Sequence, residues 1–208
     1  MLENFIEPIV KTIVNFIETT GYLGIFVAMT VESALIPLPS EITMPFAGFL
    51  VSQGKLNFWL VVTTGAVGNL LGSVIAYAIG FYLAEHVIEK LIEKYGKFIL
   101  LTRSEYIKTK TYLQKWGDIV VFASRLLPAV RTVVSLPCGL AQLPLLKFSI
   151  LTLTGSFIWS AALTYFGVIL GENWQVLRPI FEKFDFVIAG SVVILLAIYI
   201  GKKFSEKY

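Results

Sequence analysis

The sequence predicts an all-α membrane protein with two re-entrant helical hairpins and about three full transmembrane helices, arranged like an inverted repeat. The chain is 56% hydrophobic and 15% charged, whereas an average soluble domain carries about 25% charged residues. Apolar runs longer than about 18 residues recur, which is typical of transmembrane helices. Prolines interrupt two shorter apolar runs, each of which carries a pair of charges. Those two runs are the predicted hairpins.

Residues 1–20 predict an amphipathic helix, because apolar side chains recur at helical spacing between charged ones. Such a helix lies in the membrane interface or packs against other helices of the protein, and the pattern favours neither. Gly21 ends it. Glu3 and Glu7, with no basic segment and no small-residue cleavage site after them, do not predict a cleavable signal peptide.

The first predicted hairpin covers about residues 22–51. Residues 22–36 are too few to cross a hydrocarbon core of about 30 Å, and Pro37 and Pro39 then end the helix. Ser40 is a good N-cap for a second short helix, which also cannot span the core. A hairpin tip of this kind is tolerated at membrane depth only inside protein or beside a wet cavity.

A full span is predicted from about Phe58 to Leu83, with Trp59 and Tyr82 near its ends as interface anchors. Asn69 is a polar exception within this span and a candidate cavity-lining residue. Small residues recur at every fourth position, which lets a second helix approach closely. They are Gly68, Gly72, Ala76 and Gly80.

Residues 84–117 form the one sizeable polar region of the chain. The segment from Thr102 to Glu105 resembles a capping box, which predicts a helix from there to about Trp116. Its charges have mixed sign and helical spacing, so they indicate a solvated face.

The second predicted hairpin covers about residues 119–143 and mirrors the first. The apolar run Ile119–Leu127 contains Arg125, Pro128 breaks the run, and Arg131 follows. Neither apolar half is long enough to span the membrane alone.

A second full span is predicted from about Leu145 to Leu170, in which Gly155 and Ser156 allow close packing. A polar loop follows, then a third span and a basic tail. The third span covers about residues 186–200. We expect three parts: an interfacial helix at residues 1–20, a membrane-embedded core at residues 21–170, and a C-terminal segment at residues 171–208.

The distribution of basic residues predicts the topology. Residues 84–117 carry seven lysines and arginines and the C-terminal tail carries three, whereas the opposite side carries four. Basic segments stay on the cytoplasmic side, so the polar region and the C-terminus are expected there. The two hairpins then enter the membrane from opposite faces, as in an inverted repeat.

Four charges interrupt the two hairpins: Glu32, Glu41, Arg125 and Arg131. Each charge costs about 2.5–3.5 kcal/mol at the centre of a membrane helix. The proline breaks allow each pair to turn toward one cavity, where the set is formally neutral. The alternative is a buried salt-bridge network that only fixes the fold, although such networks stabilise less than apolar packing.

At these residues the sequence resembles the DedA family of membrane proteins, also called the SNARE-associated or VTT-domain family. The resemblance covers about residues 20–170. The matching pieces are Glu32, Pro37 to Glu41, the helix from Gly68 to Gly80, and Ser124 to Arg131 with the following Gly139. Members commonly have glycine or alanine near the position of Ser40, which is a minor departure.

This resemblance implies lipid transport in a bacterial cytoplasmic membrane, with undecaprenyl phosphate or phospholipids as substrates and sensitivity to the proton-motive force. It maps the essential acidic pair onto Glu32 and Glu41 and the essential arginines onto Arg125 and Arg131. We therefore expect a flippase in which the arginines bind a lipid phosphate. The acids balance the arginines and couple transport to protons.

The remaining expectations concern the surroundings of this site. Ser40, Asn69 and Ser124 are candidate cavity-lining residues, and Pro37, Pro39 and Pro128 are the hairpin breaks. The partners are the bilayer and a phosphate-headed lipid, and the size of the chain is compatible with a homo-oligomer. The net charge of +3 does not indicate nucleic-acid binding. With one cysteine and one histidine in the chain, no disulfide, metal or cofactor is expected.

Three alternatives stay open at this point. The first is an enzyme acting on a lipid phosphate, with Ser124, Ser135 or Cys138 as nucleophile, but no acid or histidine cluster of the phosphatase type accompanies them. The second is a proton-coupled ion or drug transporter that uses the same four charges. The third is a scramblase that moves phospholipids, such as phosphatidylethanolamine, without a gradient.

Overall fold

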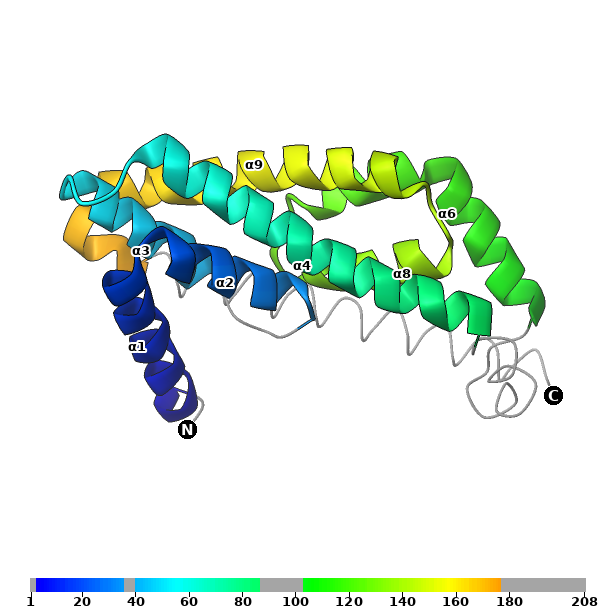
Figure 1. Ribbon diagram of the computed structural model, residues 1–208, viewed down its shortest axis with the longest axis horizontal. Coiled ribbons are helices and arrows are strands. Elements are labelled where there is room, and N and C mark those ends of the chain that lie inside the picture. The colour runs from blue at the N-terminus through cyan, green and yellow to red at the C-terminus, as the bar shows by residue number, and fades with distance from the viewer. Residues whose placement is uncertain (1–2, 36–39, 87–102, 177–208) are drawn as a thin grey trace.

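The computed structural model describes residues 3–35, 40–86 and 103–176, and all the regular structure within them is helical. Helices α4 and α9 run side by side along the length of the described structure, and α1 and α6 cross its two ends at steep angles (Figure 1). The elements are α1 (Glu3–Thr20), α2 (Tyr22–Ser33), α3 (Ser40–Ser52), α4 (Phe58–His86), α6 (Arg103–Ser124), α7 (Pro128–Val133), α8 (Ser135–Leu140), α9 (Leu145–Leu170) and a 3₁₀ helix, η1 (Gly171–Val176).

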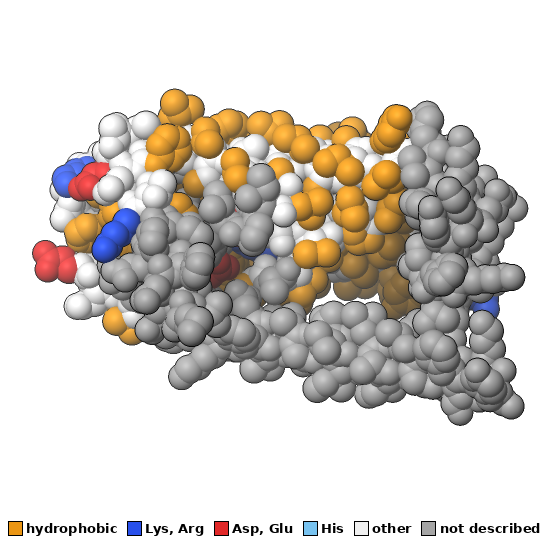
Figure 2. All heavy atoms as spheres, turned by 90° about the horizontal axis from the view of Figure 1, so that it is seen from below, with side chains coloured by type: hydrophobic (Ala, Val, Ile, Leu, Met, Phe, Trp, Pro, Cys, Tyr) orange, Lys and Arg blue, Asp and Glu red, His pale blue; other side chains and the backbone are white. Residues whose placement is uncertain are grey.

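Helices α4 and α9 are both long and apolar enough to cross a membrane. They confirm the two long apolar helices predicted at about 58–83 and 145–170, with nearly the same bounds. Large apolar side chains such as Leu71, Ile75 and Ile169 point outward from them, and hydrophobic side chains cover much of the described surface (Figure 2). The third predicted span, at 186–200, lies outside the described residues, as does the basic tail.

The glycine stripe of α4 is a packing surface, as predicted. A Cβ atom added to Gly68 would lie 2.6 Å from the carbonyl oxygen of Phe26, and one added to Gly72 would lie 2.1 Å from that of Thr30. Both carbonyls belong to α2. About two helical turns further along α4, a Cβ on Gly80 would lie 2.2 Å from the carbonyl oxygen of Leu136 in α8. The same stripe of α4 therefore holds α2 and α8 at contact distance.

Helices α3 and α9 meet in the same way, through glycines on both sides. A Cβ on Gly48 would lie 2.2 Å from the carbonyl oxygen of Thr164, and one on Gly167 would lie 2.1 Å from that of Pro45. Short helices therefore pack closely against both long helices. Glycines of the long helix, or of the short one, make this close approach possible.

Helix α1 packs partly against the protein, which answers the question its amphipathic pattern left open. Ile13 and Ile17 are 6% and 0% exposed, and both belong to a core cluster with residues of α2 and α3. Phe16, on another side of the helix, is 39% exposed. Gly21 ends the helix with a positive φ of 60°.

The prediction of a helix ending near Trp116 was wrong. Helix α6 continues to Ser124, so most of the apolar run from Ile119 is its last turns and not a separate piece. Gly117 lies inside this helix, and its missing side chain makes room for Leu143: a Cβ would lie 2.8 Å from Leu143 Cδ1. The capping box at 102–105 lies outside the residues whose side chains are described.

The chain turns after Ser124 and restarts at Pro128, which is the first residue of α7. Leu127 before it has the extended backbone, φ −113° and ψ 122°, that a following proline favours. In the N-terminal half, α2 ends at Ser33 and α3 begins at Ser40. Pro37 and Pro39 lie between them, outside the described residues.

Candidate functional site

All four charges of the predicted constellation are buried. Arg125 and Arg131 are 1% and 2% exposed, and Glu32 and Glu41 are 4% and 7% exposed. They come from four different elements: α2, the first turn of α3, the turn after α6, and α7. The proline-broken segments, far apart in sequence, therefore place their charges in one interior region.

Arg131 and Glu32 form an ion pair across the two halves of the chain. Arg131 Nη2 donates hydrogen bonds to Glu32 Oε1 and to the hydroxyl of Ser40. The backbone N–H of Ser40 also donates to Glu32 Oε1, at 3.3 Å. The guanidinium lies over the ring of Trp159 in α9, 5.6 Å from its centroid. Ser40, predicted to line the cavity, is thus a direct partner of both charges.

Arg125 has a different environment. Its Nη1 donates to Ser73 Oγ at 3.0 Å and to the carbonyl oxygen of Arg131 at 2.8 Å, and its Nη2 donates to Ser135 Oγ at 3.0 Å. Among the described residues no carboxylate pairs with it. Its guanidinium lies 5.5 Å from the ring centroid of Phe148. Arg125 is therefore a buried cation held by neutral groups.

Gly155 provides the room for this arrangement. A Cβ there would lie 2.6 Å from Arg125 Cβ and 3.0 Å from its Cγ. The close packing predicted for Gly155 is confirmed, and its partner is the stem of the buried arginine.

Glu41 makes no ion pair or hydrogen bond with the residues the structure describes, although it is buried. It lies close enough to Glu32 for the two carboxylates to interact electrostatically. Since Glu32 is paired with Arg131, the constellation consists, within the described part of the chain, of one ion pair, one carboxylate without an ion pair and one cation held by neutral groups.

The other predicted cavity-lining residues have distinct positions. Asn69 is 1% exposed and accepts a hydrogen bond from Ser33 Oγ at 2.7 Å. Ser124 Oγ instead donates to the carbonyl oxygen of Val121, in its own helix, at 2.8 Å. The structure therefore brings Asn69 beside α2, whereas Ser124 bonds within α6.

Ser73 and Ser135 hold Arg125, and the sequence pattern does not predict either as part of the charged site. Ser73 lies four residues after Asn69 on α4, so the two share a helix face. That spacing places Ser73 on the same face as Asn69, but the contact with Arg125 is seen only in the structure. Ser135, a candidate nucleophile in the sequence, instead accepts a hydrogen bond from Arg125.

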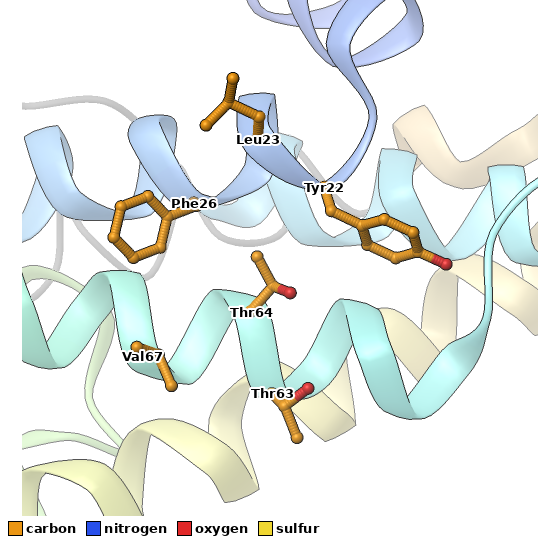
Figure 3. A pocket seen from close by; sticks show the side chains of 6 residues that line it. All are labelled: Tyr22, Leu23, Phe26, Thr63, Thr64 and Val67. Atoms are coloured by element: carbon orange, nitrogen blue, oxygen red, sulfur yellow. The ribbon is translucent and has the colours of Figure 1, made fainter.

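A separate groove lies on the surface between α2 and α4, with a volume of about 440 Å³. Figure 3 shows the side chains that line it, which are Tyr22, Leu23, Phe26, Thr63, Thr64 and Val67. None of the four buried charges lines this groove, so it is distinct from the charged site.

Comparison with known proteins identifies the family of the chain. The VTT domain matches residues 38–169, a segment that contains Glu41, Arg125 and Arg131. The chain belongs to the VTT domain family. Glu32 lies just before the matched segment, but it contacts the VTT domain through its ion pair with Arg131. No solved structure gives a significant match.

Relatives of this VTT domain protein include two named undecaprenyl phosphate transporter A. The one from Bacillus subtilis (strain 168) is 30% identical over 92% of this chain and 92% of its own length. The one from Staphylococcus aureus (strain NCTC 8325 / PS 47) is 28% identical over 93% of this chain and 97% of its own. A Lactococcus lactis relative, 30% identical over 95% of this chain and 94% of its own, is named alkaline phosphatase-like protein.

Proposed function

We propose that this VTT domain protein is a flippase that moves a phosphate-headed lipid, namely undecaprenyl phosphate, across the bacterial cytoplasmic membrane. The observation that carries the proposal is Arg125, a buried guanidinium among apolar helices without a carboxylate partner in the described chain. A guanidinium matches the geometry of a phosphate through paired hydrogen bonds. The names of the two transporter relatives support the same substrate class.

The ion pair of Arg131 supplies the control in this proposal. With no substrate, Glu32 and Ser40 occupy Arg131 Nη2. A proton taken up by the Glu32 and Glu41 pair removes a negative charge and releases Arg131 to bind phosphate beside Arg125. Proton uptake and head-group binding are thereby coupled, which makes transport dependent on the proton-motive force.

The short helices support the re-entrant arrangement as part of this proposal. Helices α2 and α3 contain 12 and 13 residues, which at 1.5 Å per residue gives about 18–20 Å, against a hydrocarbon core of about 30 Å. Helices α7 and α8 contain 6 residues each. We infer two hairpins that enter from opposite faces and expose the charges to a head group, while the lipid tail stays in the bilayer.

Transport of labelled undecaprenyl phosphate in proteoliposomes tests the function. Arg125→Ala and Arg131→Ala should each abolish it. Lys147→Ala is the matched control, since it removes a cation whose side chain is 59% exposed and pairs on the surface with Asp118 at 2.6 Å. Wild-type flux in both arginine variants would rule out the proposed site.

The same proteoliposomes separate the alternatives. Phosphate release from undecaprenyl pyrophosphate by the pure protein would favour a phosphatase, the activity that the name of the Lactococcus relative indicates for that protein. Proton flux without lipid movement would favour an ion or drug transporter. Gradient-independent movement of phosphatidylethanolamine would favour a scramblase.

A further inference from the structure

Three hydroxyl side chains on the inner face of α9 have no hydrogen-bond partner among the described residues. They belong to Thr152, Ser156 and Ser160, which are 0%, 2% and 0% exposed. Their spacing of four residues places them in one line along the helix.

Other hydroxyls in the long helices are satisfied locally. Thr63, Thr154 and Thr164 each donate to the carbonyl oxygen four residues earlier, at 2.7–2.9 Å. This local bond is available to any serine or threonine in a helix. Thr152, Ser156 and Ser160 do not make it, although buried polar groups in proteins are nearly always bonded. Their hydroxyls are therefore turned toward the interior.

The line of hydroxyls runs along α9 from one arginine to just past the other. Arg125 lies over Phe148 and Arg131 lies over Trp159, two positions about 16 Å apart along α9 at 1.5 Å per residue. Thr152 and Ser156 fall between those positions. Ser160 follows, facing α4, where its oxygen would lie 3.3 Å from a Cβ on Gly65.

The unpaired polar atoms around this line are mostly donors. Arg125 Nε, Arg131 Nε and Nη1, and Asn69 Nδ2 are buried without a partner in the described part of the chain. Glu32 Oε2 is an unpaired acceptor in the same group. A region with buried N–H groups from three side chains, lined by hydroxyls, is suited to an oxyanion.

We propose that Thr152, Ser156 and Ser160 form a hydroxyl track that binds the phosphate oxygens of the lipid head group, with Thr152 and Ser156 between Arg125 and Arg131 and Ser160 just beyond Arg131. This inference rests on the proposed function, because it names further binding residues of the same site. The hydroxyls of the track are neutral hydrogen-bond donors along α9. They replace part of the water around the phosphate, so that its oxygens stay hydrogen-bonded while the head group moves from one guanidinium to the other.

The test uses the double variant Thr152→Val/Ser156→Ala, which removes two hydroxyls with little change in volume. Its control is Thr154→Val, on the same helix, where the hydroxyl is exposed and bonded to Ile150. Binding of undecaprenyl phosphate and of inorganic phosphate to the purified protein is measured beside flux. The double variant should weaken both affinities about tenfold or more, as expected for lost bonds to a charged group, and Thr154→Val should not.

Thr152→Ser keeps a hydroxyl at the first position of the track, so it should retain wild-type affinity and show that the hydroxyl, and not the packing, is responsible. Unchanged phosphate binding by a folded double variant overturns the track, even if Arg125→Ala abolishes flux and so upholds the proposed function. Hydroxyl-dependent binding without any lipid flux in the wild type upholds the track and removes the flippase. Absence of phosphate binding in the wild type overturns the track.

Discussion

Arg125 combines features that are costly to keep together unless they serve a ligand. It is buried, it is charged, and its terminal nitrogens are held by Ser73, Ser135 and a carbonyl oxygen. Two of these acceptors bind Nη1 of the planar guanidinium and the third binds Nη2. They orient the group but leave its charge unneutralised, which keeps it attractive to an anion.

The first prediction concerns this orientation. Arg125→Lys keeps the positive charge but replaces the planar group with a single ammonium, which cannot reach acceptors at both ends of the fork. Flux of undecaprenyl phosphate should fall about tenfold or more, as for the loss of a charge-assisted hydrogen bond. Lys147→Arg, at the surface, should leave it unchanged. If Arg125→Lys transports at the wild-type rate, charge alone suffices and the fork has no role.

The second prediction concerns Glu32. Glu32→Gln removes the anion that pairs with Arg131, so a proton gradient should no longer stimulate lipid flux. Loss of one partner of a buried ion pair also costs about 3–5 kcal/mol, so the thermal unfolding temperature in detergent should drop. Glu172→Gln, on an exposed residue, is the control. A gradient response equal to that of the wild type would contradict the coupling role.

At this scale the sequence reveals charges better than hydroxyls. Glu32 and Arg131 stand out because each is a charge within an apolar run, and the structure brings them into contact. Ser73 and Ser156 do not stand out, because a serine in an apolar helix is equally typical of close helix packing. Only the contact with Arg125 shows that Ser73 faces a charge.

The helices are positioned by backbone contacts at glycines. Gly72 places α2 against α4, and Gly48 places α3 against α9. Both short helices carry an acid of the site, Glu32 on α2 and Glu41 on α3. The distance between acids and arginines is therefore set by how closely the short helices approach the long ones.

The third prediction follows from that contact. Gly72→Ala should destabilise the protein by about 1–3 kcal/mol, the usual cost of overpacking, because the new Cβ would lie 2.1 Å from the carbonyl oxygen of Thr30. Helix propensity alone predicts the opposite sign, since alanine favours a helix by about 1 kcal/mol over glycine. Thermal unfolding in detergent decides between them, with Ala78→Val on the exposed face as control. A stabilised Gly72→Ala would show that α2 and α4 are not in contact.

The bounds of α9 could be predicted because Pro144 and Gly171 flank one continuous apolar run. The continuation of α6 past Trp116 could not be predicted, because Gly117 and Asp118 have the local features of a helix end. Leu143, which packs at Gly117, comes from a distant part of the chain. Such a tertiary contact is invisible to periodicity.

The whole molecule places one polar centre inside an apolar shell. Helices α4 and α9 present apolar side chains outward, while Asn69, Ser73, Thr152 and Ser156 face inward from the same two helices. A lipid fits this division, because its tail matches the shell and its phosphate matches the centre. We therefore expect the protein to recognise the head group of the lipid and not its tail.

Transport of two lipids with the same tail tests this claim most directly. Labelled undecaprenyl phosphate and neutral undecaprenol are followed in the same proteoliposomes containing the wild-type protein. We predict that the phosphate lipid crosses faster than in protein-free vesicles, whereas the alcohol crosses at the protein-free rate. Equal acceleration of both lipids would contradict the account, because recognition would then not depend on a phosphate at Arg125 and Arg131.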